Sequence, residues 1–390
     1  MRVEEIKKHL INDIIPFWKN LKDEEKGGFY GEMDYELTLF KKADKGCILS
    51  SRILWFFSNA YMTVKDEECR SYATHAYEFL KNAFYDKEYG GVFWSVTYDG
   101  KPKDSSKHTY NQSFAIYALA SYYAITQDKE ALQLAYDLVD KVETVCRDEQ
   151  GYLEAFNRKF QPEDNEKLSE NGVMAGRTMN TLLHVFEAYT ELYRVDHNKV
   201  IADKMVWMLD IFADKIYNPK ERRLEVFFDL EYNSLINLNS YGHDIEASWL
   251  IDRGVEVLGD PKYIAKITPI TKELASHIHN VAMDESSLYN ECEDGRVDTR
   301  KVWWVQAEAI LGFLNGYQKD PTKTEYLATV GRIWDFTKNY MVDHRKGSEW
   351  FNELYKDGTP IQTKEIVGPW KCPYHNGRMC FEVINRNVSF

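Results

Sequence analysis

One histidine and one glutamate stand three residues apart at the beginning of an apolar, helix-like segment, residues 240–250. Residues three apart share one face of a helix, so the side chains of His243 and Glu246 are expected to point the same way. Histidine takes up and releases a proton near neutral pH, and an adjacent carboxylate can hold its ring in place. The pair therefore suits general acid–base catalysis, and the alternative interpretation is an oriented structural pair.

Five more segments begin a helical pattern after a loop rich in glycine and aromatic residues, and they carry polar groups at matching positions. The aligned positions are Arg52, Gln112, Asn180, Glu246, Gln306 and Arg378, separated by 60, 68, 66, 60 and 72 residues. Nearby stand His108, Tyr110, Asn111, His184, Trp249, Trp303, Trp304, Trp370, Tyr374 and His375. Buried helices are normally apolar, so this many polar groups requires an explanation.

A structural role is the simplest explanation for several of these groups. Four of them suit helix capping and mutual hydrogen bonding: Asn111, Gln112, Gln306 and Arg378. For His108 and His184 the structural and functional interpretations both stay open, and the segment before His375 would also suit a plain turn. Tryptophans are more often core residues than ligand platforms. The remaining histidines fall on predicted outer helices or their connections: His9, His75, His197, His277, His279 and His344.

The regular spacing of these segments predicts a repeat architecture. Each repeat has an amphipathic helix, a loop with short strand-like pieces, and a helix that is apolar nearly all round and therefore buried. The amphipathic segments are residues 3–21, 71–84, 130–145, 200–216, 264–281 and 324–341. We predict an all-α, single-domain (α/α)6 barrel over residues 1–390, with twelve helices in two concentric rings and short hairpins at one end. An open superhelical array is the alternative.

The loop-rich end of such a barrel is the expected functional face, because loops on a rigid scaffold commonly carry sites. The inner helices begin there, and their dipoles favour an anion that forms during a reaction. Flat aromatic side chains suit the carbon–hydrogen faces of pyranose rings. Arg52 and the amides would stabilise a developing oxyanion. The residues alone thus point to proton transfer on a sugar.

Charge and composition exclude several classes of partner. The net charge is −13 without a basic stripe, which argues against nucleic acid or an anionic membrane surface. No stretch approaches the roughly 20 apolar residues of a membrane span. The N-terminal pattern is an acidic amphipathic helix rather than a secretory signal, and six cysteines without paired spacing indicate reduced thiols. We expect a cytoplasmic protein, and a monomer.

Neither a metal site nor a nucleotide site is predicted. His243 with Glu246, and Cys372 with His375, have ligand-like spacings, but no further ligand completes either set at a recognised spacing. There is also no glycine-rich phosphate loop or dinucleotide fingerprint. We therefore expect a protein that works without a cofactor.

Six motifs in chain order are similar to those of a known family. SRILW, KHTYNQ, MNTLLH, SYGHDIEASWL, VWWVQAEA and GPWKCPYHNGRM resemble the cellobiose 2-epimerases of the N-acylglucosamine 2-epimerase superfamily. The similarity covers essentially the whole chain. The resemblance implies an (α/α)6 barrel and a cofactor-free isomerase. Its reaction would be reversible epimerisation at carbon 2 of the reducing-end glucose of cellobiose and related 4-linked disaccharides such as lactose, giving 4-O-glucosyl-mannose from cellobiose.

The resemblance also implies roles for individual residues. His243 and His375 would be the two acid/base groups, one removing the carbon-2 proton and the other returning one on the opposite face after ring opening. Glu246 would orient His243, and Arg52 would hold the enediolate oxygen. The expected substrate-binding residues are Tyr110, Asn180, His184, Trp249, Trp303, Trp304 and Trp370. Trp304 and Trp370 would be the stacking platforms. The choice between Trp303 and Trp304 as the ring that stacks on the sugar stays open.

Four other functions compete with this interpretation. An aldose–ketose isomerase would use the same histidines and deliver the proton to carbon 1, and an N-acylglucosamine 2-epimerase would act on a monosaccharide. A glycoside hydrolase on the same barrel would need two carboxylates flanking the glycosidic bond, for example Glu246 with Glu308 or Glu170. A sugar-binding protein would need no paired histidines.

Overall fold

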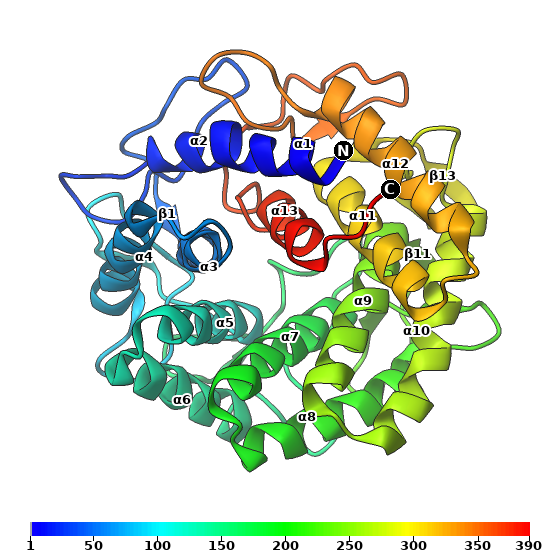
Figure 1. Ribbon diagram of the computed structural model, residues 1–390. Helices are drawn as coiled ribbons and strands as arrows, with labels where there is room; N and C mark the ends of the chain where they lie inside the picture. The colour runs from blue at the N-terminus through cyan, green and yellow to red at the C-terminus, as the bar shows by residue number, and fades with distance from the viewer. Residues whose placement is uncertain (1) are drawn as a thin grey trace.

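Helices alternate between an outer and an inner ring in the computed structural model, which describes residues 2–390 (Figure 1). The inner ring consists of α3 (Cys47–Val64), α5 (Thr109–Thr126), α7 (Met179–Asp196), α9 (Tyr241–Leu258), α11 (Trp303–Lys319) and α13 (His375–Arg386). Each inner helix packs against the next, and α13 packs against α3, so the ring is closed. This closure confirms the predicted (α/α)6 barrel and rules out the open array.

The outer ring covers the inner one and is interrupted by single π-helical turns. Its members are α1 (Arg2–His9) with η1 (Leu10–Ile14) and α2 (Ile15–Lys19); α4 (Glu67–Phe79) with η2 (Leu80–Phe84); α6 (Lys129–Thr144); α8 (Lys199–Ile211) with η3 (Phe212–Ile216); α10 (Pro261–Val281); and α12 (Thr324–Phe336) with η4 (Thr337–Met341). Helix α1 packs against α13, which brings the first and last helices together (Figure 1).

Local sequence signals fix where many of these helices begin and end. The outer helices α4, α6, α8 and α10 start after Asp66, Asp128, Asn198 and Asp260, whose side chains accept backbone N–H bonds. Five inner helices end at a residue in the left-handed conformation, as the common αL cap requires. The cap at Asp66 explains why α4 begins at Glu67, four residues before the predicted start.

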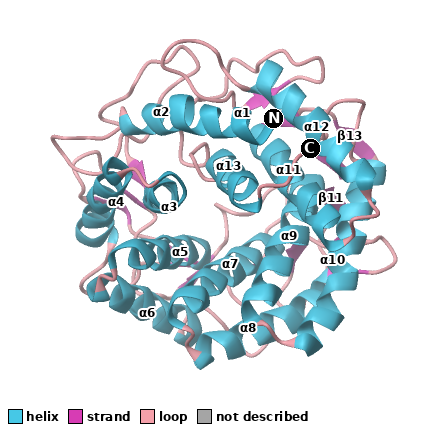
Figure 2. Cartoon of the chain, in the orientation of Figure 1, coloured by secondary structure: helices cyan, strands magenta, loops and turns pink. Residues whose placement is uncertain are grey.

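Short strands join the repeats at one end of the barrel, and Figure 2 shows them lying among the loops. They are β1 (Lys45–Gly46), β2 (Ser95–Val96), β3 (Pro102–Asp104), β4 (Lys107–His108), β5 (Ala155–Phe156), β6 (Pro162–Glu163), β7 (Arg177–Thr178), β8 (Tyr217–Asn218), β9 (Arg223–Leu224), β10 (Phe227–Phe228), β11 (Leu238–Ser240), β12 (Glu291–Glu293), β13 (Arg296–Asp298), β14 (Lys301–Val302) and β15 (Glu353–Leu354). All pairs are antiparallel, in the orders β1-β2-β3, β4-β5-β6, β7-β10, β8-β9, β11-β12-β13 and β14-β15. The strands β1, β4, β7, β11 and β14 each precede an inner helix and pair with a strand of the following repeat.

Buried ion pairs hold these strands in place. In several repeats an aspartate caps the turn after the outer helix with one carboxylate oxygen and binds a buried cation with the other. Examples are Asp23 with Lys45 (2.7 Å), Asp86 with Lys107 (3.1 Å), Asp148 with Arg177 (2.5 Å) and Asp284 with Lys301 (2.5 Å). Each cation belongs to the strand before an inner helix, so the pair fixes that helix relative to the outer ring.

Two of the aligned polar positions have the structural role that the sequence suggested. The Gln112 amide binds both the N–H and the C=O of Val92, and Gln306 binds Leu288 in the same way. Asn111 accepts the His108 N–H and donates to the Phe93 carbonyl. Arg378 has a different role, described below.

Two further features concern the apolar character of the helices and the state of the cysteines. Within residues 2–390, no helix combines the length and apolar character needed to cross a membrane. All six cysteines are free thiols, as their scattered spacing predicted.

Candidate active site

A cavity of about 480 Å³ opens where the inner helices begin. It brings together ten of the residues that the sequence singled out: Arg52, Tyr110, Asn180, His184, His243, Glu246, Trp303, Trp304, Trp370 and His375. The side chains come from all six repeats because every inner helix contributes its first turns to the same space. The convergence predicted from the repeat is therefore observed, and we call this space the front cavity.

The two predicted acid/base histidines share one neighbour. His243 lies in the first turn of α9 and His375 begins α13, and the ring centroids lie 4.9 and 5.4 Å from that of Trp304. His243 Nδ1 bonds the Ser240 hydroxyl at 2.8 Å, whereas His375 Nδ1 bonds Glu308 Oε1 at 2.7 Å. Because each Nδ1 is engaged, the Nε2 atom of each ring is the one left for a substrate.

Burial keeps both histidines neutral at pH 7. It lowers the pKa of His243 to about 3, and the neighbouring His184 contributes in the same direction. Burial also holds the pKa of His375 well below its ordinary value, and the charges of Arg378 and Arg52 add to the effect. A neutral imidazole has a free lone pair and can accept a proton, so both rings are in the form that a base requires.

Arg378 lies at the centre of a buried cluster of carboxylates. It donates from Nη1 to Glu187 Oε1 (2.5 Å), and from Nη2 to Glu246 Oε1 (2.5 Å) and Glu308 Oε1 (2.7 Å). Burial and the charge of Glu308 raise the pKa of Glu246 to about 8 despite the guanidinium. At Glu187, by contrast, Arg378 and His184 outweigh burial and lower the pKa to about 2.

The structure corrects the expected partner of Glu246. The carboxylate does not hold His243, even though the two residues stand three apart on one helix. It binds Arg378 and lies 3.8 Å from His375 Nδ1. A helical side chain leans toward the helix N-terminus, so His243 reaches back to Ser240 instead.

Trp249 also lies in a different place from the one that the sequence suggested. The side chain is 1% exposed and does not line the front cavity, although the sequence suggested contact with substrate. Its Nε1 donates to Glu308 Oε2 at 2.9 Å. Trp249 therefore supports the carboxylate that holds His375, from behind the site.

Arg52 is placed to bind an oxygen in the front cavity. Its guanidinium packs against the rings of Phe114 (4.2 Å) and Tyr374 (4.5 Å), donates to the Tyr110 hydroxyl at 3.1 Å, and contacts Cys372 Sγ at 3.6 Å. Such packing fixes the direction of the remaining N–H groups. A fixed cation of this kind stabilises negative charge on a substrate oxygen.

Two further side chains offer hydrogen-bonding groups beside Arg52. His184 Nδ1 bonds Glu187 Oε2 at 2.9 Å, which leaves its Nε2 for the cavity. Asn180 Oδ1 is buried and has no partner within residues 2–390. A buried acceptor without a partner is costly, so a ligand hydroxyl would satisfy it.

The tryptophans of the front cavity differ in exposure. Trp370 is 41% exposed, and its ring centroid lies 5.9 Å from that of Tyr110. Trp303 is buried, with Lys371 Nζ 4.5 Å from its ring centre, whereas Trp304 is partly exposed between the histidines. Trp304 and Trp370 therefore offer the accessible faces. His108 lies outside the cavity, packed on Trp94 at 4.8 Å.

The sequence did not identify several residues of the site. Glu187 stands three residues after His184, the spacing already used for His243, so the same rule would have found it. Ser240 precedes α9 at the usual position of an N-cap. No local signal marks Glu308 as the partner of His375, because the contact joins two different repeats. The outer part of the front cavity adds Glu170, Asn171, Glu291, Arg300, Glu353 and Lys364.

One group of side chains has the composition of a metal site. Glu246, Glu308 and His375 place possible ligand atoms within 4.8 Å of one another. The Arg378 guanidinium already binds both carboxylates. Its positive charge opposes a metal cation at the same oxygens, so these residues do not fit a metal ion.

The closed (α/α)6 barrel and the two neutral histidines in one cavity define a barrel protein suited to moving a proton. The sequence model of the N-acylglucosamine 2-epimerase family matches residues 28–377. The chain belongs to this family, and the resemblance seen in its motifs is confirmed. It is 50% identical to a cellobiose 2-epimerase of Ruminococcus albus over 389 residues, with 100% of both chains covered.

Solved structures show the same relationship. The crystal structure of a sugar epimerase from a ruminal bacterium is 50% identical and superposes with a TM-score of 0.99, covering 100% of both chains. The cellobiose 2-epimerase from Bacillus thermoamylovorans is 46% identical with a TM-score of 0.95, covering 98% of this chain and 99% of the other. These comparisons assign the chain to the isomerases.

Proposed function

We propose that this protein interconverts cellobiose and 4-O-glucosyl-mannose by inverting carbon 2 of the reducing-end glucose, and that related 4-linked disaccharides such as lactose are also substrates. The observation that carries the proposal is the presence of two neutral histidines, His243 and His375, in one cavity, each in contact with Trp304. Full-length identity to cellobiose 2-epimerases supports the same substrate class.

The reaction requires one base and one acid at carbon 2 of the open-chain sugar. One histidine Nε2 removes the carbon-2 proton, and the electron pair moves toward the carbonyl at carbon 1 to form an enediolate. Arg52 binds the oxygen on which the negative charge develops. The other histidine takes up a proton from solvent on Nε2 and delivers it to the opposite face of carbon 2, and the first histidine releases the carbon-2 proton to solvent. The two histidines exchange roles in the reverse direction.

Glu308 and Arg378 would make His375 suitable for both roles. The Glu308 carboxylate accepts the Nδ1 proton and fixes the ring orientation, while Arg378 restrains the carboxylate. Tyr110, Asn180 and His184 would bind sugar hydroxyls and assist ring opening, and Trp370 would stack on a sugar ring. We propose no role for a cofactor.

Hydrolysis of a glycosidic bond fits this arrangement less well. It requires two carboxylates facing the bond, one of them free to give a proton. Glu246 and Glu308 both bind Arg378, and Glu308, which also binds His375, does not line the front cavity, so the two carboxylates do not both face a bound sugar. The histidines would also have no role in such a reaction.

The size of the front cavity favours a disaccharide. Its outer part adds charged and amide side chains, among them Glu170 and Arg300, beyond the histidines. Binding energy from an outer sugar ring can position the reacting carbon, so a shorter substrate should lose turnover as well as affinity. We expect cellobiose and lactose to exceed glucose and N-acetylglucosamine in kcat/KM.

Incubation with cellobiose followed by product analysis tests the proposal. We expect 4-O-glucosyl-mannose, formed without added metal or nucleotide and after treatment with a chelator. Glucosyl-fructose would identify an aldose–ketose isomerase, free glucose would identify a hydrolase, and no change would identify a binding protein. Faster reaction of N-acetylglucosamine would place the chain in another branch of the family.

We further propose that the active form is a cytoplasmic monomer and that residues 1–390 act as a single domain. The contacts of α13 with both α1 and α3 support the latter, since the last helix completes the ring begun by the first. Size-exclusion chromatography with light scattering tests the monomer.

A further inference from the structure

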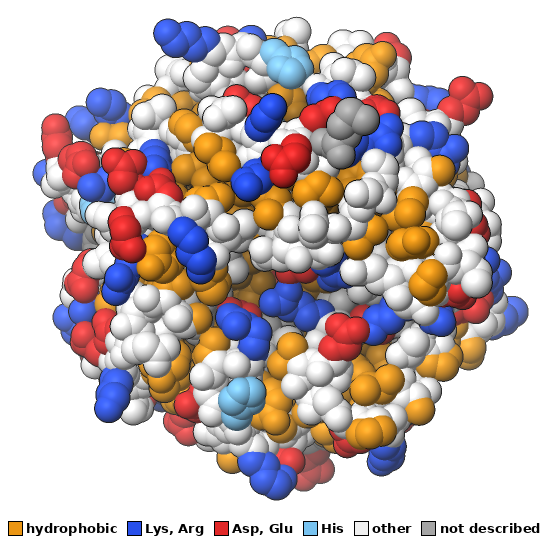
Figure 3. Space-filling view, viewed as in Figure 1, with side chains coloured by type: hydrophobic (Ala, Val, Ile, Leu, Met, Phe, Trp, Pro, Cys, Tyr) orange, Lys and Arg blue, Asp and Glu red, His pale blue; other side chains and the backbone are white. Residues whose placement is uncertain are grey.

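A second cavity, of about 330 Å³, lies at the opposite end of the inner ring. Its walls come from the last turns of inner helices, including Asn59 of α3, Arg194 of α7, Arg253 of α9 and Arg386 of α13. Figure 3 shows this end of the barrel, with a central hollow and basic side chains around it. We call this space the back cavity. No residue named in the proposed reaction contacts it except those of the Arg378 cluster.

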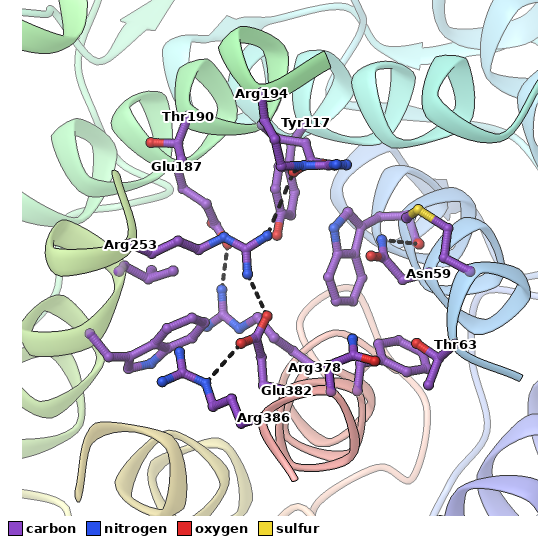
Figure 4. Close-up of a pocket in the computed structure, with 17 residues that line it drawn as sticks. Asn59, Thr63, Tyr117, Glu187, Thr190, Arg194, Arg253, Arg378, Glu382 and Arg386 are labelled. Carbon is purple, nitrogen blue, oxygen red and sulfur yellow. Dashed lines mark hydrogen bonds and ion pairs between the residues drawn. The ribbon is translucent and has the colours of Figure 1, made fainter. Parts of the chain in front are cut away.

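Arginine side chains surround the back cavity. Figure 4 shows the four guanidinium groups around the space, and the chain provides three carboxylates among them: Glu187, Glu191 and Glu382. The neighbouring arginines outweigh burial and keep the pKa of each carboxyl below its ordinary value. All three are therefore ionised at neutral pH, so the lining holds four guanidinium groups and three carboxylates, while Glu246 and Glu308 bind Arg378 from outside the lining.

The carboxylates of the back cavity are already bound. Glu382 accepts hydrogen bonds from Arg253 and from Arg386 Nε (3.0 Å). Glu191 accepts two from Arg194, at 2.7 and 2.9 Å, and one from the Ser121 hydroxyl. Each arginine has five N–H donors, so the wall still has more donors than acceptors. An occupant that supplies hydrogen-bond acceptors would bind the remaining donors.

Arg378 provides the most specific of these donors. The side chain is 2% exposed and lines the back cavity rather than the front one. Both of its Nη atoms bind carboxylates or Tyr374, but Nε is buried and has no partner among residues 2–390. A buried N–H without an acceptor is costly, which indicates a ligand atom at this position.

We propose that the back cavity is a binding site for a small oxyanion, either phosphate or a carboxylate, held by Arg378 Nε together with Arg194 and Arg253. Guanidinium groups bind the oxygens of both anions in the same geometry. The volume holds such an anion with hydration water. None of its residues is required to touch the sugar, and Arg378 is the one group that the site shares with the support of His375.

Equilibrium dialysis of the full-length protein with radiolabelled phosphate, at fixed ionic strength in a low-chloride buffer, tests the site. We expect saturable binding of one phosphate per chain that saturating cellobiose does not displace. Competition by acetate shows that the site accepts carboxylates, and failure of acetate to compete shows a site selective for phosphate. Absence of saturable phosphate and acetate binding, or displacement by cellobiose, overturns the proposal, since the latter places the anion in the front cavity.

Two variants locate the anion. Arg253→Gln removes a partly exposed cation and should weaken binding at least about tenfold, the effect of losing one charged hydrogen bond. Asn385→Asp adds a negative charge at an exposed residue of the rim without a change in side-chain size, so the fold should be kept and affinity should fall. Asn82→Asp, an equal change on an exposed residue of the outer segment η2, is the matched control. Binding that is equal in Asn385→Asp and Asn82→Asp would contradict the assignment.

Discussion

The surroundings of His243 and of His375 differ in charge, although both rings lie at the beginning of an inner helix and both contact Trp304. His243 is held by a neutral hydroxyl, Ser240. His375 is held by a carboxylate that belongs to the Arg378 cluster. In the proposed reaction each histidine acts as base in one direction and as acid in the other. The proposal therefore assigns the same chemistry to two rings whose supporting groups differ in charge.

Removal of either histidine ring should have the largest effect on kcat/KM. His243→Ala and His375→Ala should each lower kcat/KM for epimerisation at least about 100-fold, within the range of a lost general acid or base. Steady-state kinetics with cellobiose measures the loss, and circular dichroism checks that the barrel remains folded. A folded variant with activity within about tenfold of the wild type would remove that histidine from the acid/base role.

Loss of the negative charge of Glu308, which supports His375, should have the next largest effect on catalysis. Glu308→Gln keeps the size of the side chain but removes the negative charge that stabilises the His375 imidazolium. We expect kcat to fall about tenfold or more while KM changes little, because the loss concerns the transition state. Kinetics of the variant with cellobiose separates the two parameters. An equal rise in KM with unchanged kcat would instead show that Glu308 acts in substrate binding.

Loss of the Ser240 hydroxyl, which supports His243, should lower kcat by a smaller factor. The Ser240 hydroxyl makes no capping hydrogen bond to α9, so Ser240→Ala removes only the contact with His243. One neutral hydrogen bond contributes about 1 kcal/mol, so kcat should fall about fivefold or less. Parallel measurements on Ser240→Ala and Glu308→Gln compare the two supports directly. A larger loss of kcat in Ser240→Ala than in Glu308→Gln would contradict this order.

The acid limb of the pH profile should reflect the burial of both rings. The pKa of His243 is lowered to about 3 and that of His375 well below its ordinary value, so both stay neutral as the pH falls through about 6.5. The histidine that acts as base therefore stays active near pH 6, and protonation of the histidine that acts as acid increases as the pH falls, so kcat/KM should decline only at lower pH. Each of these two histidines binds more protons in the unfolded chain than in the native one in this range, so their contribution to stability decreases as the pH falls. Circular dichroism at each pH separates the two effects, and a half-maximal kcat/KM at about 6.5 would contradict the account.

The repeat made most of the fold predictable from the sequence. Six apolar helices at a spacing of 60 to 72 residues must be buried together, so the side chains of their first turns converge on one space. Arg52, Asn180 and His375 therefore meet in one cavity. A further repeated signal in the sequence is an aspartate before a glycine-containing turn, at Asp23, Asp86 and Asp148 in the first three repeats.

The hydrogen-bond partners of side chains inside the barrel could not be predicted in the same way. Arg378 binds Glu187, Glu246 and Glu308, which come from three other repeats, and the spacing of residues along one helix does not describe such contacts. The direction of Trp249 was also open, because an inner helix is buried on all sides and its sequence does not separate the front cavity from the back one.

Solvent labelling tests the two-histidine account most directly. Cellobiose is converted in deuterium oxide by the wild-type protein, and the early product is analysed at carbon 2 by mass spectrometry and proton NMR. Removal of the proton by one histidine and delivery of a new one by the other predicts glucosyl-mannose with one deuterium at carbon 2. Early product that retains the original hydrogen at carbon 2 would contradict proton transfer between two separate bases.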